Sequence, residues 1–392
     1  MAPNSDVHPP TFVLDFQDHS VRVAGDYVAG RVELNLARAQ DEGVESLRVN
    51  LQGCMVTTII EGNSDGADAR HEQTVELIKS SKTLWDRGTA FPDPGSHVLD
   101  LPFQFKLPEN LPPSFHICGC HHEAVIRYGI EVVGHRPGRL RKDRRIEKSL
   151  TVLPAASPAQ VLAKRTLKQG WGGPWKTFFL DQKIRQGIWG DHSHVRIEVK
   201  MPKLESYPRA TPLPVKFYIE TRTKPMSRTD APEDKSHRPL FPAPPTQSAD
   251  VKLYFHRAAS IRANRKYGTG NDSFQTRGGL GDPTSTKVKS TVDAAEWIPD
   301  PKKQDQGVWK RAVRFETKEL LPYAPSFSTE TIECKYFLRF TVSFPGIGND
   351  LKLNVPIHLD PVHGRLSSTT YADVPPDDPY PFLDDCPPAY CT

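Results

Sequence analysis

The sequence lacks a long hydrophobic run, a secretory leader and an excess of one charge. No stretch of the 392 residues approaches the roughly 20 apolar residues that a transmembrane helix needs. The first residues, MAPNSD, do not form a basic segment followed by an apolar core, so we expect no secretory signal. The net charge is only +4. Without a basic excess or a basic-aromatic platform, we expect no nucleic-acid partner.

Cysteine pairs and catalytic motifs are also missing. The sequence contains no Gly-x-Ser-x-Gly, His-Glu-x-x-His or phosphate-binding loop, so we expect neither a catalytic residue nor a cofactor. The cysteines do not have the spacing of a disulfide scaffold, which, with the absent leader, indicates a cytoplasmic protein with reduced thiols. The six cysteines are Cys54, Cys118, Cys120, Cys334, Cys386 and Cys391.

Alternating apolar residues predict short β-strands along most of the chain. In the first half apolar residues alternate in five stretches, the last interrupted at Lys148, and glycine, proline and aspartate separate the stretches. The alternation becomes irregular after Gly53, as at a β-bulge. The abundant proline, 37 residues, suits strands and turns better than long helices. The stretches are 28–36, 47–51, 103–107, 126–132 and 146–152.

The second half repeats this pattern. Residues 336–344 and 351–359 alternate on either side of a turn at 346–350 and predict a β-hairpin. The other alternating stretches are 195–201, 215–219, 251–255 and 309–315, the last with Arg311 interrupting its apolar face. The whole predicts an all-β protein of two consecutive antiparallel β-sandwiches of immunoglobulin type.

The domain boundaries follow from composition. Ser157 and Pro158 suit the start of a short helix ending at Lys168, although the same segment also resembles an interdomain linker. Two segments of the second half are long enough to predict functional or disordered loops. We expect a flexible N-terminus at 1–11, an N-terminal sandwich at 12–155, a linker at 156–190, a C-terminal sandwich at 191–360 with loops 223–249 and 267–306, and a tail at 361–392.

The tail carries the most informative motif, the PPxY sequence Pro387, Pro388, Ala389 and Tyr390. Adjacent prolines favour the polyproline II conformation, which the aromatic grooves of WW domains bind, and the tyrosine can fill a second pocket. Residues 361–392 are rich in proline and aspartate and show no apolar periodicity, so we expect a disordered, accessible tail.

Three further motifs occur in an informative order. Residues 23–32 read VAGDYVAGRV, a glycine-bearing turn that enters a strand. LPPSF at 111–115 is followed by VIRY at 125–128, and CKYFLRF at 334–340 by VPI at 355–357. Together with the PPxY sequence, this set resembles the α-arrestins, the arrestin-domain-containing trafficking adaptors, over residues 12–153 and 190–360. The buried polar core that senses phosphates in visual and β-arrestins does not map onto this sequence.

The resemblance implies a non-enzymatic adaptor with two arrestin-like sandwiches. Such an adaptor binds the cytosolic tail of a membrane transporter or receptor. Its PPxY motif recruits a HECT-type ubiquitin ligase with WW domains, so that tethering raises the ligase concentration near the cargo. Ubiquitin is then attached to the cargo, which is endocytosed or sorted. The implied location is the cytoplasm, with recruitment to the plasma membrane or endosomes and peripheral membrane association.

The densest basic run, HRPGRLRKDRR at 135–145, lies between two predicted strands and should form an exposed loop. Arginine binds carboxylate and phosphate oxygens through paired hydrogen bonds, so acidic cargo tails or acidic lipids are its candidate partners. The other interpretation is a solvated loop. The candidate contact residues are Arg136, Arg139, Arg141, Lys142, Arg144 and Arg145.

Two other functions compete with the adaptor interpretation. The same fold would serve a retromer-like sorting scaffold that recruits no ligase. A metal-dependent enzyme on a β-sandwich is the third hypothesis, because Cys118, Cys120, His121 and His122 are potential zinc ligands. Structural zinc sites usually combine ligand pairs from two separated segments, and no second pair is present, so we expect a plain loop and no metal.

Overall fold

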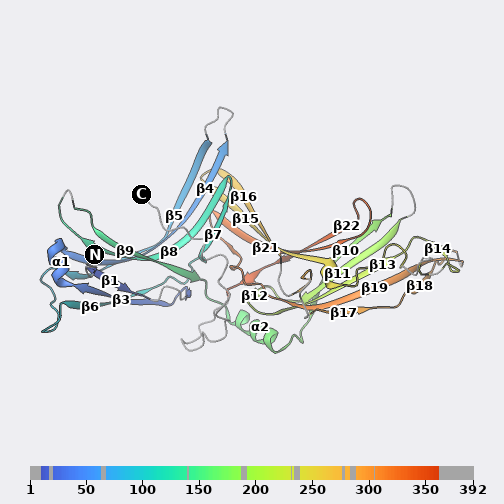
Figure 1. The fold of residues 1–392 in the computed structure, drawn as a ribbon, viewed down its shortest axis with the longest axis horizontal. Helices are drawn as coiled ribbons and strands as arrows, with labels where there is room; N and C mark the ends of the chain where they lie inside the picture. The colour runs from blue at the N-terminus through green and yellow to red at the C-terminus, as the bar shows by residue number, and fades with distance from the viewer. Residues whose placement is uncertain are drawn as a thin grey trace, which may run out of the picture.

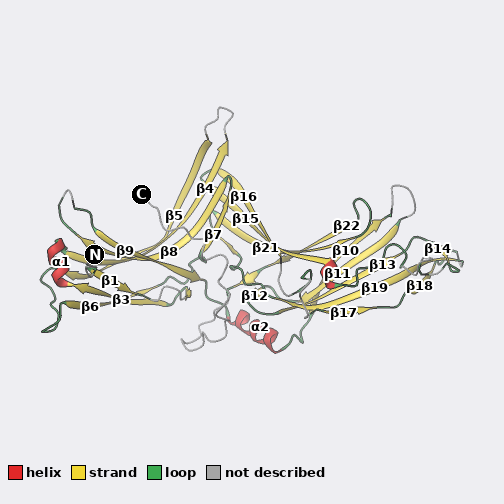
Figure 2. Cartoon of the chain, viewed as in Figure 1, coloured by secondary structure: helices red, strands yellow, loops and turns green. Residues whose placement is uncertain are grey.

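The computed structural model describes residues 10–16, 21–62, 68–138, 141–186, 192–230, 232–233, 239–275, 279–282, 288–303 and 305–361. Two β-rich halves lie end to end, and the hairpin of β4 and β5 rises where they meet (Figure 1). Helix in the described chain is limited to α1 (Leu36–Glu42), α2 (Pro158–Gln169) and a short 3-10 turn at Ser248–Asp250 (Figure 2). The predicted all-β, two-sandwich fold is confirmed. The PPxY motif lies outside the described residues.

The N-terminal half consists of a three-stranded and a six-stranded sheet. Both sheets are antiparallel except where β2 pairs with β9 in parallel. The small sheet has the order β1 (Phe12–Asp15), β3 (Tyr27–Asn35), β6 (Val98–Lys106). The large sheet has the order β2 (Val21–Val23), β9 (Arg144–Leu153), β8 (His122–His135), β4 (Ser46–Gly62), β5 (Asp68–Asp86), with β7 (Phe115–Gly119) also paired to β8.

Close packing around Tyr128 explains two features of the sequence. The β4–β5 register shifts between Gly53 and Cys54, where the alternation predicted a bulge. A Cβ atom at Gly53 would lie 2.3 Å from the Tyr128 ring, so only glycine fits there. The Tyr128 hydroxyl donates to the Pro112 carbonyl at 2.8 Å. The LPPSF and VIRY motifs therefore fasten a loop to the strand β8.

The C-terminal half contains a seven-stranded and a five-stranded sheet. A further parallel pair joins β12 (Tyr207–Pro208) to β23 (Leu359–Asp360). The first sheet has the order β10 (Trp175–Ile184), β11 (Ser193–Pro202), β13 (Leu213–Arg222), β19 (Gln306–Glu319), β14 (Met226–Ser227), with β17 (Lys289–Val292) and β18 (Glu296–Pro299) also on β19. The second has the order β16 (Lys266–Gln275), β15 (Val251–Ala263), β21 (Ile332–Ser343), β20 (Phe327–Ser328), with β22 (Asp350–Ile357) also on β21.

The predicted β21–β22 hairpin is present, with Ser343 opposite Asp350 and Tyr336 opposite Ile357. Two other segments differ from expectation. The segment 156–190, expected as a linker, contains β10, and the segment 267–306, expected as a loop, contains most of β16 and all of β17 and β18. In the described chain β10 pairs only with β11, and β16 only with β15. Such edge strands need less apolar alternation, which is why the pattern missed them.

The sequence predicted one of the two α-helices and missed the other. The expected short helix is α2, which Ser157 caps in a reciprocal capping box with Gln160. The Gln160 side chain also donates to Asp360 at 2.8 Å and so ties the helix to the end of β23. Helix α1 was missed, because Leu36 continues the apolar alternation of β3. Asn35 caps this helix and Gly43, with φ of 72°, ends it.

The two halves share one apolar core and exchange hydrogen bonds. The Phe115 ring meets Phe327 edge-on at 5.0 Å between centroids. The Thr57 hydroxyl donates to the Arg262 carbonyl at 2.7 Å, and the backbone N–H of Asn264 donates to Gln73 Oε1 at 2.7 Å. The β4–β5 and β15–β16 hairpins therefore lie side by side at the junction, as Figure 1 also shows.

Candidate functional site

The basic run forms the connection between β8 and β9, as the sequence predicted. Several of its side chains are already bound within the protein. Arg136 Nε donates to the Glu42 carbonyl at 2.8 Å, Arg144 Nε donates to Glu42 Oε2 at 2.8 Å, and Arg145 Nη1 donates to Glu131 Oε1 at 2.7 Å. These three arginines fasten the loop to α1 and β8, so they are less available to a partner.

Glu42 is the centre of this attachment. Burial alone would raise the pKa of its carboxyl group. Hydrogen bonds from Thr11 and Arg144, with the positive charges of Arg144 and Arg136, outweigh burial and hold the pKa below its ordinary value. Glu42 is the last residue of α1, so the two arginines also lie at the negative end of the helix.

Arg141 and Lys142 are the exposed remainder of the run. Within residues 10–361, as far as the structure describes them, neither side chain has a carboxylate partner. Arg139 lies outside the described residues. Of the six candidate contacts, two described side chains thus have no carboxylate partner among the described residues, although the guanidinium group of Arg141 lies close to Gly43 at the end of α1. Binding of cargo or acidic lipid by this loop stays a prediction.

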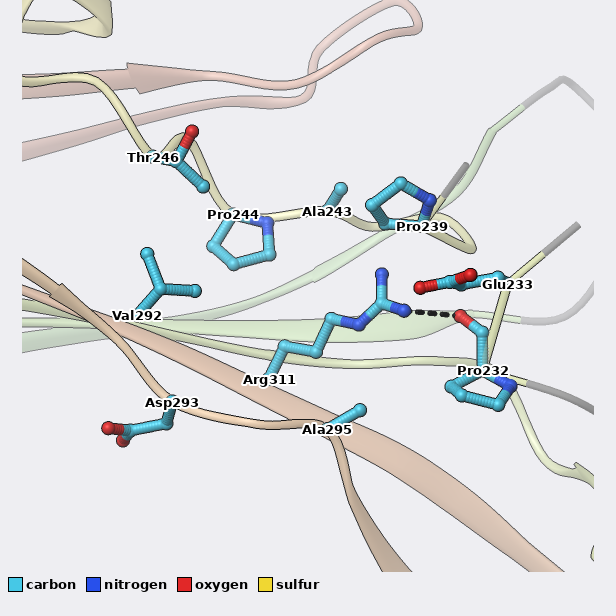
Figure 3. Close-up of a pocket in the computed structure, with 10 residues that line it drawn as sticks. All are labelled: Pro232, Glu233, Pro239, Ala243, Pro244, Thr246, Val292, Asp293, Ala295 and Arg311. Atoms are coloured by element: carbon cyan, nitrogen blue, oxygen red, sulfur yellow. Dashed lines mark hydrogen bonds between the residues drawn. The ribbon is translucent and has the colours of Figure 1, made fainter. Parts of the chain in front are cut away.

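A second candidate is a cavity of about 240 Å³ around Arg311, with three prolines in its wall (Figure 3). Arg311 Nη2 donates to the Pro232 carbonyl, while Nη1 is buried without a hydrogen-bond partner in the described part of the chain. Burial lowers the pKa of Arg311, and the charge of Glu233 opposes this. Glu233 and Asp293 line the same cavity, so its charge does not favour an anionic ligand. Arg311 instead supports Pro232 through this hydrogen bond.

The Cys–His run forms the end of β7 and the turn into β8, where Cys118 and Cys120 are exposed. Among the described residues, no three Cys, His, Asp or Glu side chains are arranged to hold a metal ion. His122 instead packs against the other half of the molecule, since a Cβ atom at Gly270 would lie 2.8 Å from its Nε2. The run therefore lies at the junction between the halves.

Alkylation should distinguish the exposed thiols from the buried one. We expect iodoacetamide at pH 8 to modify Cys118 and Cys120 at least about 100-fold faster than Cys334. Burial raises the pKa of Cys334 to about 11 and also blocks the reagent. Burial and the charge of Glu123 raise the pKa of Cys118 above its ordinary value, so its labelling should increase further as the pH is raised above 8. Peptide mass spectrometry after timed quenching measures the rates, and equal rates in the folded protein would contradict this assignment.

Within the described residues, no helix is both long enough and apolar enough to cross a membrane. Residues 11–157 match the family model of the arrestin (or S-antigen) N-terminal domain. A search of curated proteins found no match to the chain. The matched segment comprises both sheets of the N-terminal half and ends at the cap of α2. The N-terminal half is therefore similar in sequence to an arrestin N-terminal domain.

Proposed function

We propose that the protein is a trafficking adaptor that binds a membrane-protein cargo and recruits a WW-domain ubiquitin ligase of the HECT type. The arrestin N-terminal domain match supports an adaptor-like, non-enzymatic role in trafficking or signalling. The observation that carries the ligase proposal is the PPxY sequence at 387–390, in a segment that follows the folded halves.

The described structure suits this division of roles. The two halves share a core and are linked by hydrogen bonds, so they present their outer faces as one body to a cargo. The tail connects this body to a ligase and raises the ligase concentration near the cargo. In this proposal ubiquitin is transferred to the cargo, and the adaptor acts in the cytoplasm and at the plasma membrane or endosomes.

The cargo contact in this proposal includes Arg141 and Lys142. Both are exposed in the β8–β9 loop, and both carry charge that the protein does not neutralise within its described residues. An acidic stretch of a cargo tail could pair with them without breaking the contacts of Arg136, Arg144 and Arg145. We therefore narrow the predicted cargo contact from the whole run to these two residues and Arg139.

Ligase recruitment is tested by replacing the tyrosine of the motif. Tyr390→Ala should weaken binding of a WW domain to the full chain by at least about tenfold, because it removes a buried aromatic anchor. Isothermal titration calorimetry measures the affinity, and Tyr371→Ala in the same tail is the matched control. Undiminished binding of Tyr390→Ala would reject ligase recruitment by this motif and favour the retromer-like sorting scaffold.

A further inference from the structure

A cavity of about 510 Å³ lies in the C-terminal half. Its apolar wall comes from four strands, with Phe178 from β10, Tyr207 from β12, Phe337 from β21 and Ile357 at the end of β22. The cavity is open to solvent on one side and most of its lining is apolar, which suits the side chains of a peptide.

The cavity exists because two edge strands meet there. In the described chain β10 pairs only with β11, and β22 pairs only with β21. These two strands close the C-terminal sandwich along one side without hydrogen bonds between them. The cavity lies between these strands, and Leu204, Glu205 and Tyr207 also line it.

The polar groups around the cavity include two lysines, a histidine and the carboxylate of Glu205. Lys176 Nζ lies 4.9 Å from the centre of the Phe178 ring, and no carboxylate pairs with it among the described residues. Lys335 is exposed and pairs with Glu333 at 2.8 Å. His358 also lines the cavity. Glu205 supplies the one carboxylate among the lining residues that the structure describes. The arrangement favours an acidic ligand with aromatic groups.

The tail leaves the folded body at the edge of this cavity. The Tyr207 amide donates to the His358 carbonyl at 2.7 Å, and both residues line the cavity. Two residues later, Asp360 ends β23, the last strand of the structure. The chain therefore enters the tail within a few residues of the cavity wall.

The tail has the complementary chemistry. Residues 377–385 read DDPYPFLDD, so Tyr380 and Phe382 stand between two pairs of aspartates. We propose that this segment docks in the cavity, with its aromatic rings against Phe178 and Phe337 and its aspartates near Lys176 and Lys335. The connection from residue 361 to residue 377 has a root-mean-square reach of about 20–25 Å if it behaves as a flexible chain, so it does not prevent the contact. Its short length gives a local concentration of roughly a millimolar.

Docking would regulate the proposed ligase recruitment. The PPxY motif begins at Pro387, two residues after Asp385, so a docked segment holds the motif against the body. A WW domain must then displace the segment or bind the undocked molecules. Its apparent association constant is the intrinsic constant multiplied by the fraction of undocked molecules. This consequence rests on the proposed function, whereas the docking itself does not.

Carbodiimide cross-linking of the full chain tests the docking directly. This reagent joins a lysine amine to a carboxylate only when they are in contact. We expect Lys176 or Lys335 to be joined to one of the aspartates of 377–385 within one molecule, as shown by peptide mass spectrometry on mixed heavy and light protein. Lys176→Glu with Lys335→Glu should abolish these products. Lys289→Glu, a change at an exposed lysine of β17 outside the cavity, should leave them unchanged.

Three results would overturn the docking. The first is the absence of cross-links between these lysines and the aspartates of 377–385. The second is an equal yield of cross-links between Lys289 and those aspartates. The third is cross-links formed only between molecules, which would assign the cavity to the tail of a second copy. Because both cavity lysines are exposed, the paired variant should keep its thermal unfolding midpoint, which the same samples can verify.

WW-domain titration separates the docking from the proposed function. The paired lysine variant should bind a WW domain about three- to tenfold more tightly than the unaltered chain, and the isolated peptide 383–392 should bind at least as tightly as the variant. Equal affinities for chain and variant would overturn the masking of the motif. If neither the chain nor the peptide binds, the proposed function fails, while the cross-links still decide the docking.

Discussion

Phe255→Ala is expected to lower the free energy of unfolding by about 3–5 kcal/mol, because it opens a cavity in a packed core. Phe255 has 0% of its surface exposed. Its ring stacks on Tyr323 at 4.2 Å and on Tyr336 at 4.8 Å between centroids. Alanine would leave both tyrosine rings without this neighbour, at the centre of the second sandwich.

Urea denaturation followed by tryptophan fluorescence measures this loss. Phe255→Leu should recover most of the stability, because leucine refills much of the volume. Tyr267→Ala is the matched control on the neighbouring strand β16, since Tyr267 is 78% exposed and its loss should cost less than about 0.5 kcal/mol. If Phe255→Ala cost no more than Tyr267→Ala, the packing described for β15 would be wrong.

Arg257→Ala is expected to cost about 2–4 kcal/mol, because it removes one partner of a largely buried ion pair and a link between the halves. Arg257 follows Phe255 on the same face of β15 and is 8% exposed. Its Nε donates to Asp272 Oδ2 at 2.8 Å, and Nη1 donates across the junction to the His116 carbonyl at 3.2 Å. Its guanidinium group also lies over the Phe115 ring, 5.3 Å from the centroid.

The planar guanidinium group makes these contacts together, so Arg257→Lys should recover only part of the loss. Hydrogen exchange gives a second measurement, since protection should fall in β7 of the other half as well as in β15. The control is Arg314→Ala. Arg314 pairs with Asp293, but its side chain is 53% exposed, so this ion pair should contribute less than about 1 kcal/mol. A loss of protection limited to β15 would show that Arg257 does not couple the halves.

The parts of the fold that the sequence predicted well are strands with one buried face. In β22, Leu351, Leu353, Val355 and Ile357 are all buried while their neighbours are exposed, so the period of two is unbroken. The edge strand β16 was missed for the opposite reason. Strand β16 reads KYGTGNDSFQ and has no apolar alternation, and it is a strand because β15 supplies ten paired positions for it.

The basic run shows the same limit for function. Its charge and its place in a loop were evident from the sequence. Which arginines remain available was not, because Arg144 pairs with Glu42, 102 positions earlier in the chain. No local pattern contains that contact. Arg257 was missed as well, since its partners Asp272 and His116 come from another strand and from the other half.

By itself, the sequence determined the all-β class, the β21–β22 hairpin, the cap of α2 and the presence of a PPxY motif. Each of these depends on residues that are close along the chain. Only the tertiary structure decided that Arg136 and Arg144 bind Glu42, that Arg257 joins the two halves, and that a cavity with two lysines in its wall opens beside the last strand. These features combine strands that are distant in sequence, and burial and pairing between such strands are set by the packed fold.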